Sequence, residues 1–260
     1  AGINVILDPI MIFGLIGFPR LGICGAALAT IIAQAVSATL ILRTLHVRHR
    51  LLHLFIPTAR ELWASWKEIL YIGIPCCLTN LLMPLSSAII TRIVAGYGVA
   101  AVAACGAAGR IEMFSFMVPM ALGISLVPFV GQNYGANRLD RIIQGRFLGN
   151  AFAFLWGAFI CAVLFFAAPF IARLFSKDPK VIETIVLYLR IVPIGYGMME
   201  IHRYTGFFLN GARKPFHATT LNILRMACLL IPLSLLGSWL FGLKGLFWGR
   251  VTADVISAAV

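Results

Sequence analysis

Charged residues are scarce in this chain. Only 12% of its 260 residues are Asp, Glu, Lys or Arg, and only nine of these are acidic, whereas 61% of the chain is hydrophobic. Soluble domains carry roughly 25% charged residues, so a soluble fold of this length would leave too much apolar surface in water. The composition, with a mean hydropathy of +0.96, excludes an ordinary soluble domain and favours a protein whose outer surface lies in a bilayer.

Signatures of enzymes, nucleotide sites and metal sites are also missing from the sequence. There is no G-x-G-x-x-G, no G-K-[ST], no H-E-x-x-H, no C-x-x-C and no recognisable Ser/His/Asp set. The six cysteines lie in apolar stretches, where they are expected to act as small packing residues. His46, His49 and His53 stand among arginines that repel a cation. We therefore expect neither an enzyme nor a metal site.

Long apolar runs are abundant. Seven of them are long enough to cross a bilayer as helices, and an eighth, at residues 1–18, is partial. The runs are continuous rather than alternating, which favours helices over a β-barrel. The sequence thus predicts an all-α, polytopic transmembrane helix bundle, and both ends of the chain suggest a truncated piece of a longer protein. The seven runs are 21–42, 69–91, 98–130, 147–172, 182–210, 216–241 and 245–260.

Positive charge exceeds negative charge, with 21 Lys and Arg against nine Asp and Glu. In a soluble protein this excess would suggest nucleic acid as a partner. Here the basic residues lie mostly between apolar runs, as in cytoplasmic loops and membrane-edge anchors, so we expect a lipid bilayer and no nucleic acid. The loops on the side of the membrane that carries the basic stretch 43–67 contain more Arg and Lys than the loops on the other side. We therefore place it in the cytoplasm, in a multi-pass protein of the cytoplasmic (inner) membrane.

The first and last apolar segments form an internal repeat. In each, an asparagine precedes a G-x-x-G motif, and a polar residue follows among small ones: Asn4, Gly22 to Gly25 and Gln34 in one copy; Asn222, Gly242 to Gly245 and Asp254 in the other. Many secondary transporters are built from such repeats. We expect residues 1–42 to end one lobe, 43–67 to be a basic cytoplasmic linker, and 68–260 to form most of a second lobe.

Three motifs resemble the multidrug and toxic compound extrusion (MATE) family of transporters. The first is NVILDP at 4–9, followed by LGICGAALAT at 21–30. The second is PFVGQNYGA at 128–136, at the end of a span. The third is LNG at 209–211, followed by KP at 214–215. The resemblance runs along the whole chain.

The resemblance implies two lobes of six helices each, with this chain holding the end of the fifth helix and helices six to twelve, the last incomplete. It implies alternating-access export of organic cations, drugs or other xenobiotics by exchange for protons or sodium. No cofactor is expected beyond that coupling ion, and we expect a monomer.

Asn4 and Asp8 are the first candidates for cation coupling. They are four residues apart, so they share a helix face and their side chains are within hydrogen-bonding reach. Pro9 leaves the carbonyl of Val5 without its helical donor. A carboxylate, an amide and a free carbonyl suit a proton or a sodium ion, and acids within a membrane are functional candidates by default. The alternative is that Asp8 only caps a helix near the membrane edge. Proton-coupled family members, as the resemblance implies, carry Asn and Asp at this spacing.

A second group of candidates lies in the second lobe: Glu112, Glu200, Asn80 and Asn210. Each is a candidate substrate or cation ligand, with a structural alternative. Glu112 is equally suited to an ion pair with a neighbouring helix, Glu200 to a local pair with Arg203, and the asparagines to joining helices. We favour a salt bridge between Arg250 and Asp254, one turn apart. Sodium-type members, by the resemblance, use acids on the seventh and tenth helices. Glu200 falls on the tenth, but the interior of the seventh has none.

Five arginines within apolar runs support an alternative function. They are Arg110, Arg190, Arg203, Arg225 and Arg250. A flippase for lipid-linked oligosaccharides, from the same broad superfamily, needs basic residues around a pyrophosphate. This alternative gains if the arginines share one cavity, and it loses if each is paired with an acid or a carbonyl.

Overall fold

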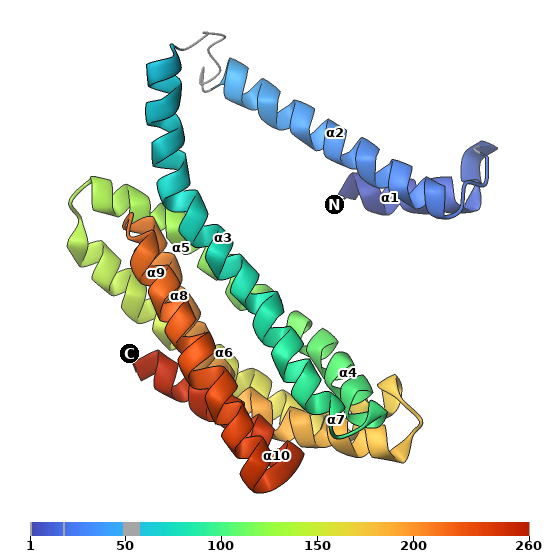
Figure 1. Cartoon of the computed structure of the whole chain (residues 1–260). Helices are drawn as coiled ribbons and strands as arrows, with labels where there is room; N and C mark the ends of the chain where they lie inside the picture. The colour runs from blue at the N-terminus through green and yellow to red at the C-terminus, as the bar shows by residue number, and fades with distance from the viewer. Residues whose placement is uncertain (1, 18, 49–57, 260) are drawn as a thin grey trace. The chain divides into compact units, whose positions relative to one another are not determined.

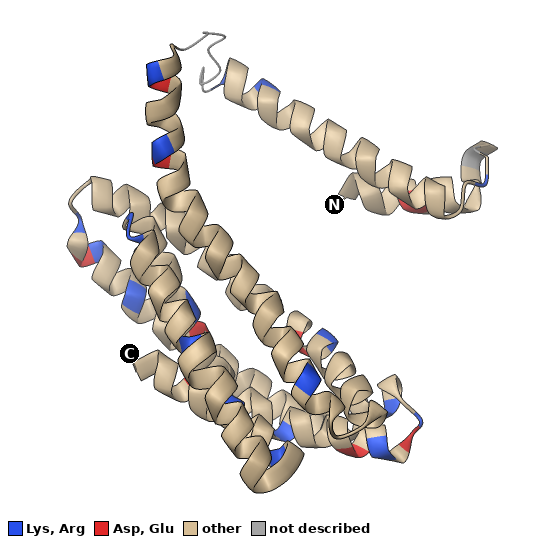
Figure 2. Ribbon diagram, viewed as in Figure 1, with Lys and Arg blue, Asp and Glu red and all other residues tan. Residues whose placement is uncertain are grey.

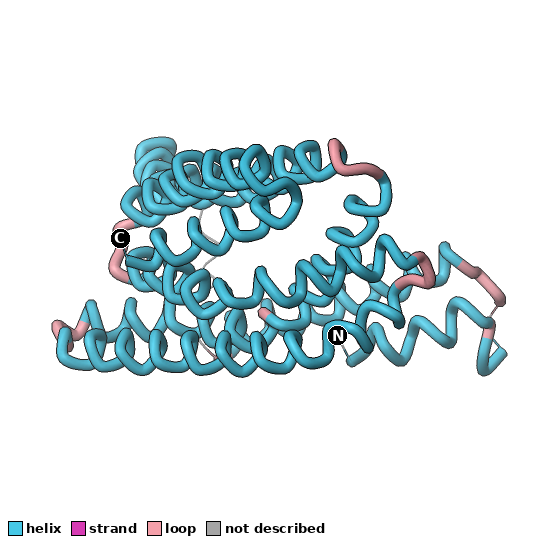
Figure 3. The backbone as a smooth tube through the Cα atoms, turned by 90° about the horizontal axis from the view of Figure 1, so that it is seen from below, coloured by secondary structure: helices cyan, strands magenta, loops and turns pink. Residues whose placement is uncertain are grey.

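The computed structural model describes residues 2–17, 19–48 and 58–259. Within these ranges the chain is built from helices joined by short loops, and Figure 3 draws no strand. This agrees with the predicted all-α bundle. The middle of the expected basic linker, including His49, Arg50 and His53, lies outside the described residues.

The chain divides into two compact units, residues 1–63 and 64–260. The division falls inside the stretch 43–67. Both sides of that stretch are helical, because one helix continues to Val47 and the next begins at Ala59. Figure 2 shows Lys, Arg, Asp and Glu concentrated near helix ends, with long uncharged stretches between them.

Unit 1 is a pair of helices (Figure 1). α1 (Gly2–Phe13) leads through a short 3-10 turn, Leu15–Gly17, into α2 (Ile23–Val47). The two helices touch at Gly25, where an added Cβ would lie 2.4 Å from the carbonyl oxygen of Met11. A glycine at this position therefore sets how closely the helices approach. The first residues of the next helix complete the unit.

Unit 2 holds the remaining helices. They are α3 (Ala59–Ala95, from residue 64 onward), α4 (Val99–Ser115), α5 (Met117–Gly135), α6 (Leu139–Phe175), α7 (Pro179–Ile191), α8 (Tyr196–Gly211), α9 (Pro215–Ile223) and α10 (Ile231–Ala259). A 3-10 turn, Val192–Gly195, joins α7 to α8, and a π-helical turn, Leu224–Leu230, joins α9 to α10. The α7–α8 stretch is the most buried of the apolar segments, because it packs against α4, α5, α6 and α10.

Five helical stretches of the described chain are long and apolar enough to cross a membrane, and a bent pair makes a sixth. That pair is α4 and α5, which are bent by 51° next to Phe116, so the run predicted at 98–130 is not one straight helix. The stretch 215–259 reverses at Phe241 and Gly242, whose backbone is not helical. Gly245 then packs against Gly237, and Gly249 against Leu233, so the last two predicted spans run back along each other.

The internal repeat is visible in backbone geometry. Gly22, before α2, has φ 54° and ψ −127°, and Gly242, at the reversal in α10, has φ 63° and ψ −146°. This region is open to glycine and costly for other residues. The second glycine of each G-x-x-G motif, Gly25 or Gly245, then abuts a backbone carbonyl of the preceding helix. Both copies therefore place a glycine with positive φ before the second helix and a second glycine against a backbone carbonyl, that of Met11 in one copy and of Gly237 in the other.

Candidate functional site

The polar site of unit 1 joins α1 to α2. The amide of Asn4 donates to Oδ1 of Asp8 at 3.3 Å, as the spacing predicts, and lies equally far from the hydroxyl oxygen of Thr30 on α2. Thr30 also donates to the carbonyl of Ala26. Within the described residues, no basic side chain lies within 4.0 Å of Asp8. The half-buried carboxylate thus has polar neutral neighbours and no counter-ion.

The matching position in unit 2 has different chemistry. Aligning the two copies of the repeat places Asn222 opposite Asn4, Met226 opposite Asp8 and Arg250 opposite Thr30. Asn222 donates to the carbonyl of Ala218 at 2.9 Å, while Met226 and Arg250 both face a cavity. The repeat has therefore kept the asparagine while replacing the acid with a thioether and the hydroxyl with a guanidinium.

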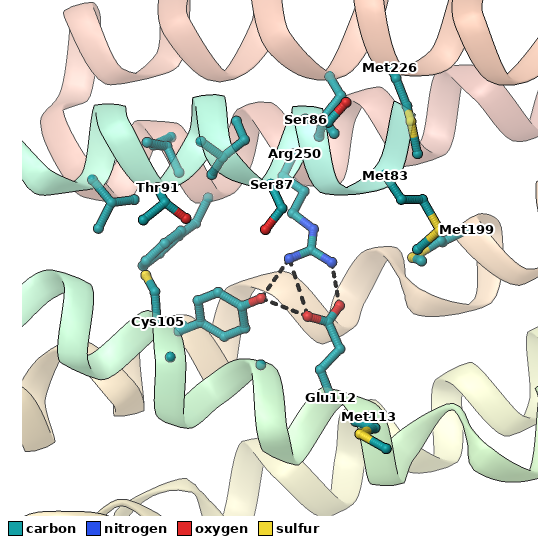
Figure 4. A pocket seen from close by; sticks show the side chains of 18 of the residues that line it. Met83, Ser86, Ser87, Thr91, Cys105, Glu112, Met113, Met199, Met226 and Arg250 are labelled. Carbon is teal, nitrogen blue, oxygen red and sulfur yellow. Dashed lines mark hydrogen bonds and ion pairs between the residues drawn. The ribbon is translucent and has the colours of Figure 1, made fainter. Parts of the chain in front are cut away.

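A cavity of about 580 Å³ lies within unit 2, between α3, α4, α7, α8 and the α9–α10 stretch. Its wall is mostly apolar and contains flexible and aromatic side chains. Four are methionines, which adapt to varied shapes, three are aromatic and three carry hydroxyls. Figure 4 shows Met83 and Met199 beside one another, and Ser87 directed toward Arg250. These ten residues are Met83, Met113, Met199, Met226, Phe116, Tyr188, Phe247, Ser86, Ser87 and Thr91. The charged residues of the wall are Glu112, Arg203, Arg225 and Arg250.

An ion-paired triad forms one wall of the cavity (Figure 4). Arg250 on α10 pairs with Glu112 on α4, and its Nη1 also donates to the hydroxyl oxygen of Tyr188 on α7 at 2.5 Å. The Tyr188 hydroxyl in turn donates to Oε2 of Glu112 at 3.0 Å. Three helices are thereby joined by one set of charge-assisted contacts. Glu112 takes the structural alternative named for it, a pair with a neighbouring helix, and it still borders the cavity.

The predicted salt bridge between Arg250 and Asp254 is wrong. Asp254 is fully buried and pairs instead with Arg225, whose Nη2 and Nε lie 2.5 and 3.2 Å from Oδ1. One turn of helix separates Arg250 from Asp254, but the two side chains leave α10 toward different neighbours. The second carboxylate oxygen, Oδ2, is buried without a hydrogen-bond partner among the described residues.

The structural alternative named for Glu200, a local pair with Arg203, is present in the structure. Arg203 Nη1 lies 3.1 Å from Oε1 of Glu200, and the guanidinium lies 4.9 Å from the centre of the Phe116 ring. Glu200 is only 1% exposed, and neither of its oxygens has hydrogen-bond geometry to a described residue. It stands behind the cavity wall rather than in it, whereas Arg203 lines the cavity.

The remaining predicted residues lie elsewhere. Asn80 is exposed on α3 and Asn210 is half-buried near the end of α8, and neither borders the cavity. Arg110 and Arg190 are exposed outside it as well. Of the five arginines, three therefore share one cavity, and each of those three is paired with an acid. The described residues contain no cluster of His, Cys, Asp and Glu suited to a metal.

The sequence reasoning missed three contributors: Thr30, Tyr188 and the methionines of the cavity wall. For Thr30 a signal was available in the sequence. It lies in the LGICGAALAT motif and occupies the repeat position equivalent to Arg250, which was already a candidate residue. Tyr188 and the methionines had none, because only the packing of separate helices brings them to one cavity.

A bundle of long apolar helices, with a repeated helical hairpin and a charged cavity in an apolar wall, defines a polytopic membrane transporter. The sequence profile of the MatE family matches residues 75–236, more than half of the chain. The chain belongs to this family, whose members are transporters rather than enzymes. It is a multi-pass membrane protein with apolar helices suited to a lipid bilayer.

Relatives and a solved structure agree with this assignment. The chain is 38% identical over 94% of its length to the "FAD transporter" of Shewanella oneidensis, and 29% identical over 99% to the "Multidrug export protein MepA" of Staphylococcus haemolyticus. It superimposes on the Vibrio cholerae MATE transporter VcmN in its bent form with a TM-score of 0.89, at 32% identity over 99% of this chain and 57% of that one. The chain covers 54% and 56% of the two curated relatives, about half their length.

Proposed function

We propose that the full-length protein is an antiporter that exports amphipathic aromatic molecules, organic cations first among them, in exchange for protons or sodium. The observation that carries this proposal is the Asn4–Asp8–Thr30 site. There an acid is held among polar neutral groups, with no basic partner in the part of the chain that the structure describes. We further propose that the protein works as a monomer in the cytoplasmic membrane.

The coupling follows from the energetics of charge in an apolar medium. A carboxylate without a counter-ion is costly within a membrane, so it gains from binding a proton or a sodium ion. The Asp8 carboxylate and the Thr30 hydroxyl supply hard oxygen ligands of the kind that a small cation takes. Loading this site favours whichever transporter conformation holds the ion more tightly, and alternating access follows from that difference in affinity.

Transport by the full-length protein in proteoliposomes tests the proposal. A proton gradient or a sodium gradient is imposed, and efflux of ethidium, a fluorescent organic cation, is followed. Gradient-driven efflux is expected, and it should be lost in Asp8→Asn. Asp140→Asn is the matched control, since Asp140 lies in the exposed first turn of α6, and it should transport normally. Efflux that survives Asp8→Asn would move coupling to Glu112 or Glu200.

The cavity of unit 2 suits the proposed substrates. Its methionine and aromatic side chains give an adaptable apolar surface. Glu112 supplies a negative group to a cation that displaces Arg250 from it. The relatives named multidrug export proteins support an amphipathic substrate of this kind.

A second candidate substrate is an anionic aromatic dinucleotide. The specific observation is that three arginines, Arg203, Arg225 and Arg250, line the same cavity, and the 38% identical relative is named an FAD transporter. A phosphate group gains from a guanidinium through paired hydrogen bonds. Since each guanidinium is already paired with an acid, the phosphate has to displace that acid or share its arginine.

One substitution separates the two substrate classes by the sign of its effect. Glu112→Gln removes the acid that holds Arg250 while keeping the shape of the side chain. Binding of ethidium to the full-length protein should weaken about tenfold, whereas binding of FAD should tighten by a similar factor. Both affinities are measured by fluorescence, with the thermal stability of the variant measured beside them. If Glu112→Gln weakens binding of FAD and leaves binding of ethidium unchanged, the cation proposal is overturned. Glu112 would then act by orienting Arg250 toward FAD.

The flippase alternative is tested by the same reconstitution. The three cavity arginines share one site, as a pyrophosphate requires, but all three are engaged by acids. No efflux of ethidium or FAD under either gradient, with transbilayer movement of a fluorescent pyrophosphate-linked lipid, would replace the antiporter proposal with the flippase.

A further inference from the structure

A second hollow in unit 2 shares no lining residue with the charged cavity. It has a volume of about 480 Å³ and is formed by α6, the 3-10 turn and the start of α8. Its lining consists of apolar side chains, with no acid, base or amide. The lining residues are Phe154, Gly157, Ala158, Cys161, Ala162, Phe165, Phe166, Ile194, Gly197 and Met198. We call it the α6–α8 groove.

The groove follows from how these helices cross. A Cβ on Gly157 would lie 2.4 Å from the backbone nitrogen and Cα of Gly197, so the two backbones are in contact at the crossing. Pro193 lies in the 3-10 turn that interrupts the helix just before this point, because proline cannot continue the hydrogen-bonding ladder. Small residues on α6, Ala158 and Ala162, leave the space beside the crossing open, and large phenylalanines flank it. The hollow is thus a fixed consequence of backbone geometry.

A guanidinium stands at the edge of this groove. Arg190, near the end of α7, lies with its guanidinium carbon 5.3 Å from the centre of the Phe165 ring, which lines the groove. The side chain is exposed, and no acid of the described residues lies within 4.0 Å of it. A charged group beside an apolar, membrane-facing groove is costly unless an anion or water reaches it. Its long stem allows the charge to extend toward the membrane surface.

More positive charge lies where α6 ends. Arg173 falls seven residues after Phe166, so both lie on one face of α6, and both are exposed. Lys177 and Lys180 follow in the loop and the first turn of α7, with Asp178 and Glu183 as the acids of this region. Asp178 is engaged as the N-cap of α7, accepting from the backbone of Lys180. The groove therefore runs from an apolar floor toward a net positive end.

We propose that the α6–α8 groove binds one acyl chain of an anionic phospholipid, with the lipid phosphate held by Arg190 and drawn by the basic end of α6. The apolar lining matches the chain, and the unpaired guanidinium matches the phosphate, as in other basic pockets between membrane helices. The site is separate from the coupling site and the charged cavity. A failure of the antiporter proposal would leave it unaffected.

Lipid binding to the full-length protein tests this site. The protein, purified in detergent and stripped of lipid, is titrated with phosphatidylglycerol or phosphatidylcholine, and bound lipid is counted by native mass spectrometry. The first bound phosphatidylglycerol should be held about fivefold more tightly than phosphatidylcholine, as one basic contact allows. Arg190→Gln should remove this preference and Arg190→Lys should keep most of it. Arg110→Gln, which removes another exposed arginine within a span, should leave the preference unchanged.

A second variant tests the groove itself. Ala158→Trp fills the hollow from an exposed position, so it should weaken binding of both lipids while leaving the melting temperature near that of the parent. Three results would overturn the proposal: a phosphatidylglycerol preference that persists in Arg190→Gln, unchanged lipid binding in Ala158→Trp, or a protein dimer that only Ala158→Trp disrupts. The last result would assign the groove to a second copy of the protein.

Discussion

Two copies of one helical hairpin carry opposite chemistry in this protein. In unit 1 the asparagine of the repeat contacts an acid, Asp8, that has no basic partner among the described residues. In unit 2 the equivalent asparagine lies one helical turn before Met226. Three acids of unit 2, Glu112, Glu200 and Asp254, are paired with arginines. In both copies a glycine with positive φ, Gly22 or Gly242, precedes the second helix of the hairpin.

The difference separates two uses of a carboxylate in a membrane. An acid paired with a guanidinium is neutralised as a pair, so it joins helices and has little tendency to take up a cation. An acid whose neighbours are neutral polar groups is still stabilised by binding a proton or a cation. The repeat thus supplies a common scaffold. Its side chains give one copy the acid that we propose for ion binding, and give the other copy a buried acid paired with an arginine.

The largest effect that tests this comparison is on stability. Arg225→Ala should destabilise the protein by about 3–5 kcal/mol, because it leaves the buried Asp254 without its counter-ion. Asp8→Ala should change stability by about 1 kcal/mol or less, since only a hydrogen bond is lost. Thermal unfolding of the full-length protein in detergent measures both. The double variant Arg225→Met with Asp254→Leu is the control and should recover most of the stability. Equal losses for Arg225→Ala and Asp8→Ala would contradict the comparison.

The triad on the cavity wall should respond to loss of one hydroxyl. Tyr188→Phe removes the group that contacts both Glu112 and Arg250, and hydrogen bonds to charged groups contribute about 1.5–3 kcal/mol. The melting temperature should fall accordingly. Tyr134→Phe is the matched control, since Tyr134 is exposed near the end of α5, and its melting temperature should not change. An unchanged melting temperature in Tyr188→Phe would show that the ion pair is sufficient without the phenol.

The shared scaffold is tested by two equivalent glycines. Gly25→Ala and Gly245→Ala should each destabilise by about 1–2 kcal/mol, because the new Cβ meets a backbone carbonyl of the preceding helix. Gly73→Ala is the control: nothing lies within 4 Å of its Cβ position, and alanine in a helix interior is expected to stabilise slightly. Chemical unfolding in detergent provides the measurement. Opposite signs for the two equivalent glycines would show that the copies pack differently.

The smallest expected effect concerns Thr30. Thr30→Val keeps the side-chain shape but removes the hydroxyl next to Asn4, so the affinity for the coupling ion should fall about fivefold, as one neutral hydrogen bond or ligand contact allows. The dependence of efflux rate on proton or sodium concentration measures this shift. Thr39→Val, at another exposed position of α2, is the control. A Thr30→Val protein with unaltered ion dependence would confine the site to Asn4 and Asp8.

The predictable part of the fold came from composition and run length. Apolar runs without charges fix where helices cross a bilayer, because their backbone must satisfy its own hydrogen bonds there. The contact of Asn4 with Asp8 and the pair of Glu200 with Arg203 were predictable too, since they depend only on helical spacing. The partner of Arg250 was not predictable from spacing. Helical spacing favoured Asp254, but the packing of α10 near α4 and α7 places the Arg250 guanidinium against Glu112 instead.

The sequence by itself determined the class of the protein, the repeat and the acid–amide pair of unit 1, because these depend on hydropathy, on motif order and on contacts within a single helix. Only the tertiary structure decided which acid neutralises which arginine, which residues share the cavity, and where the α6–α8 groove opens. Those outcomes depend on the angles and distances at which separate helices cross. In this chain such crossings are set by backbone contacts at Gly25, Gly157 and Gly245, whose consequences no local pattern of residues records.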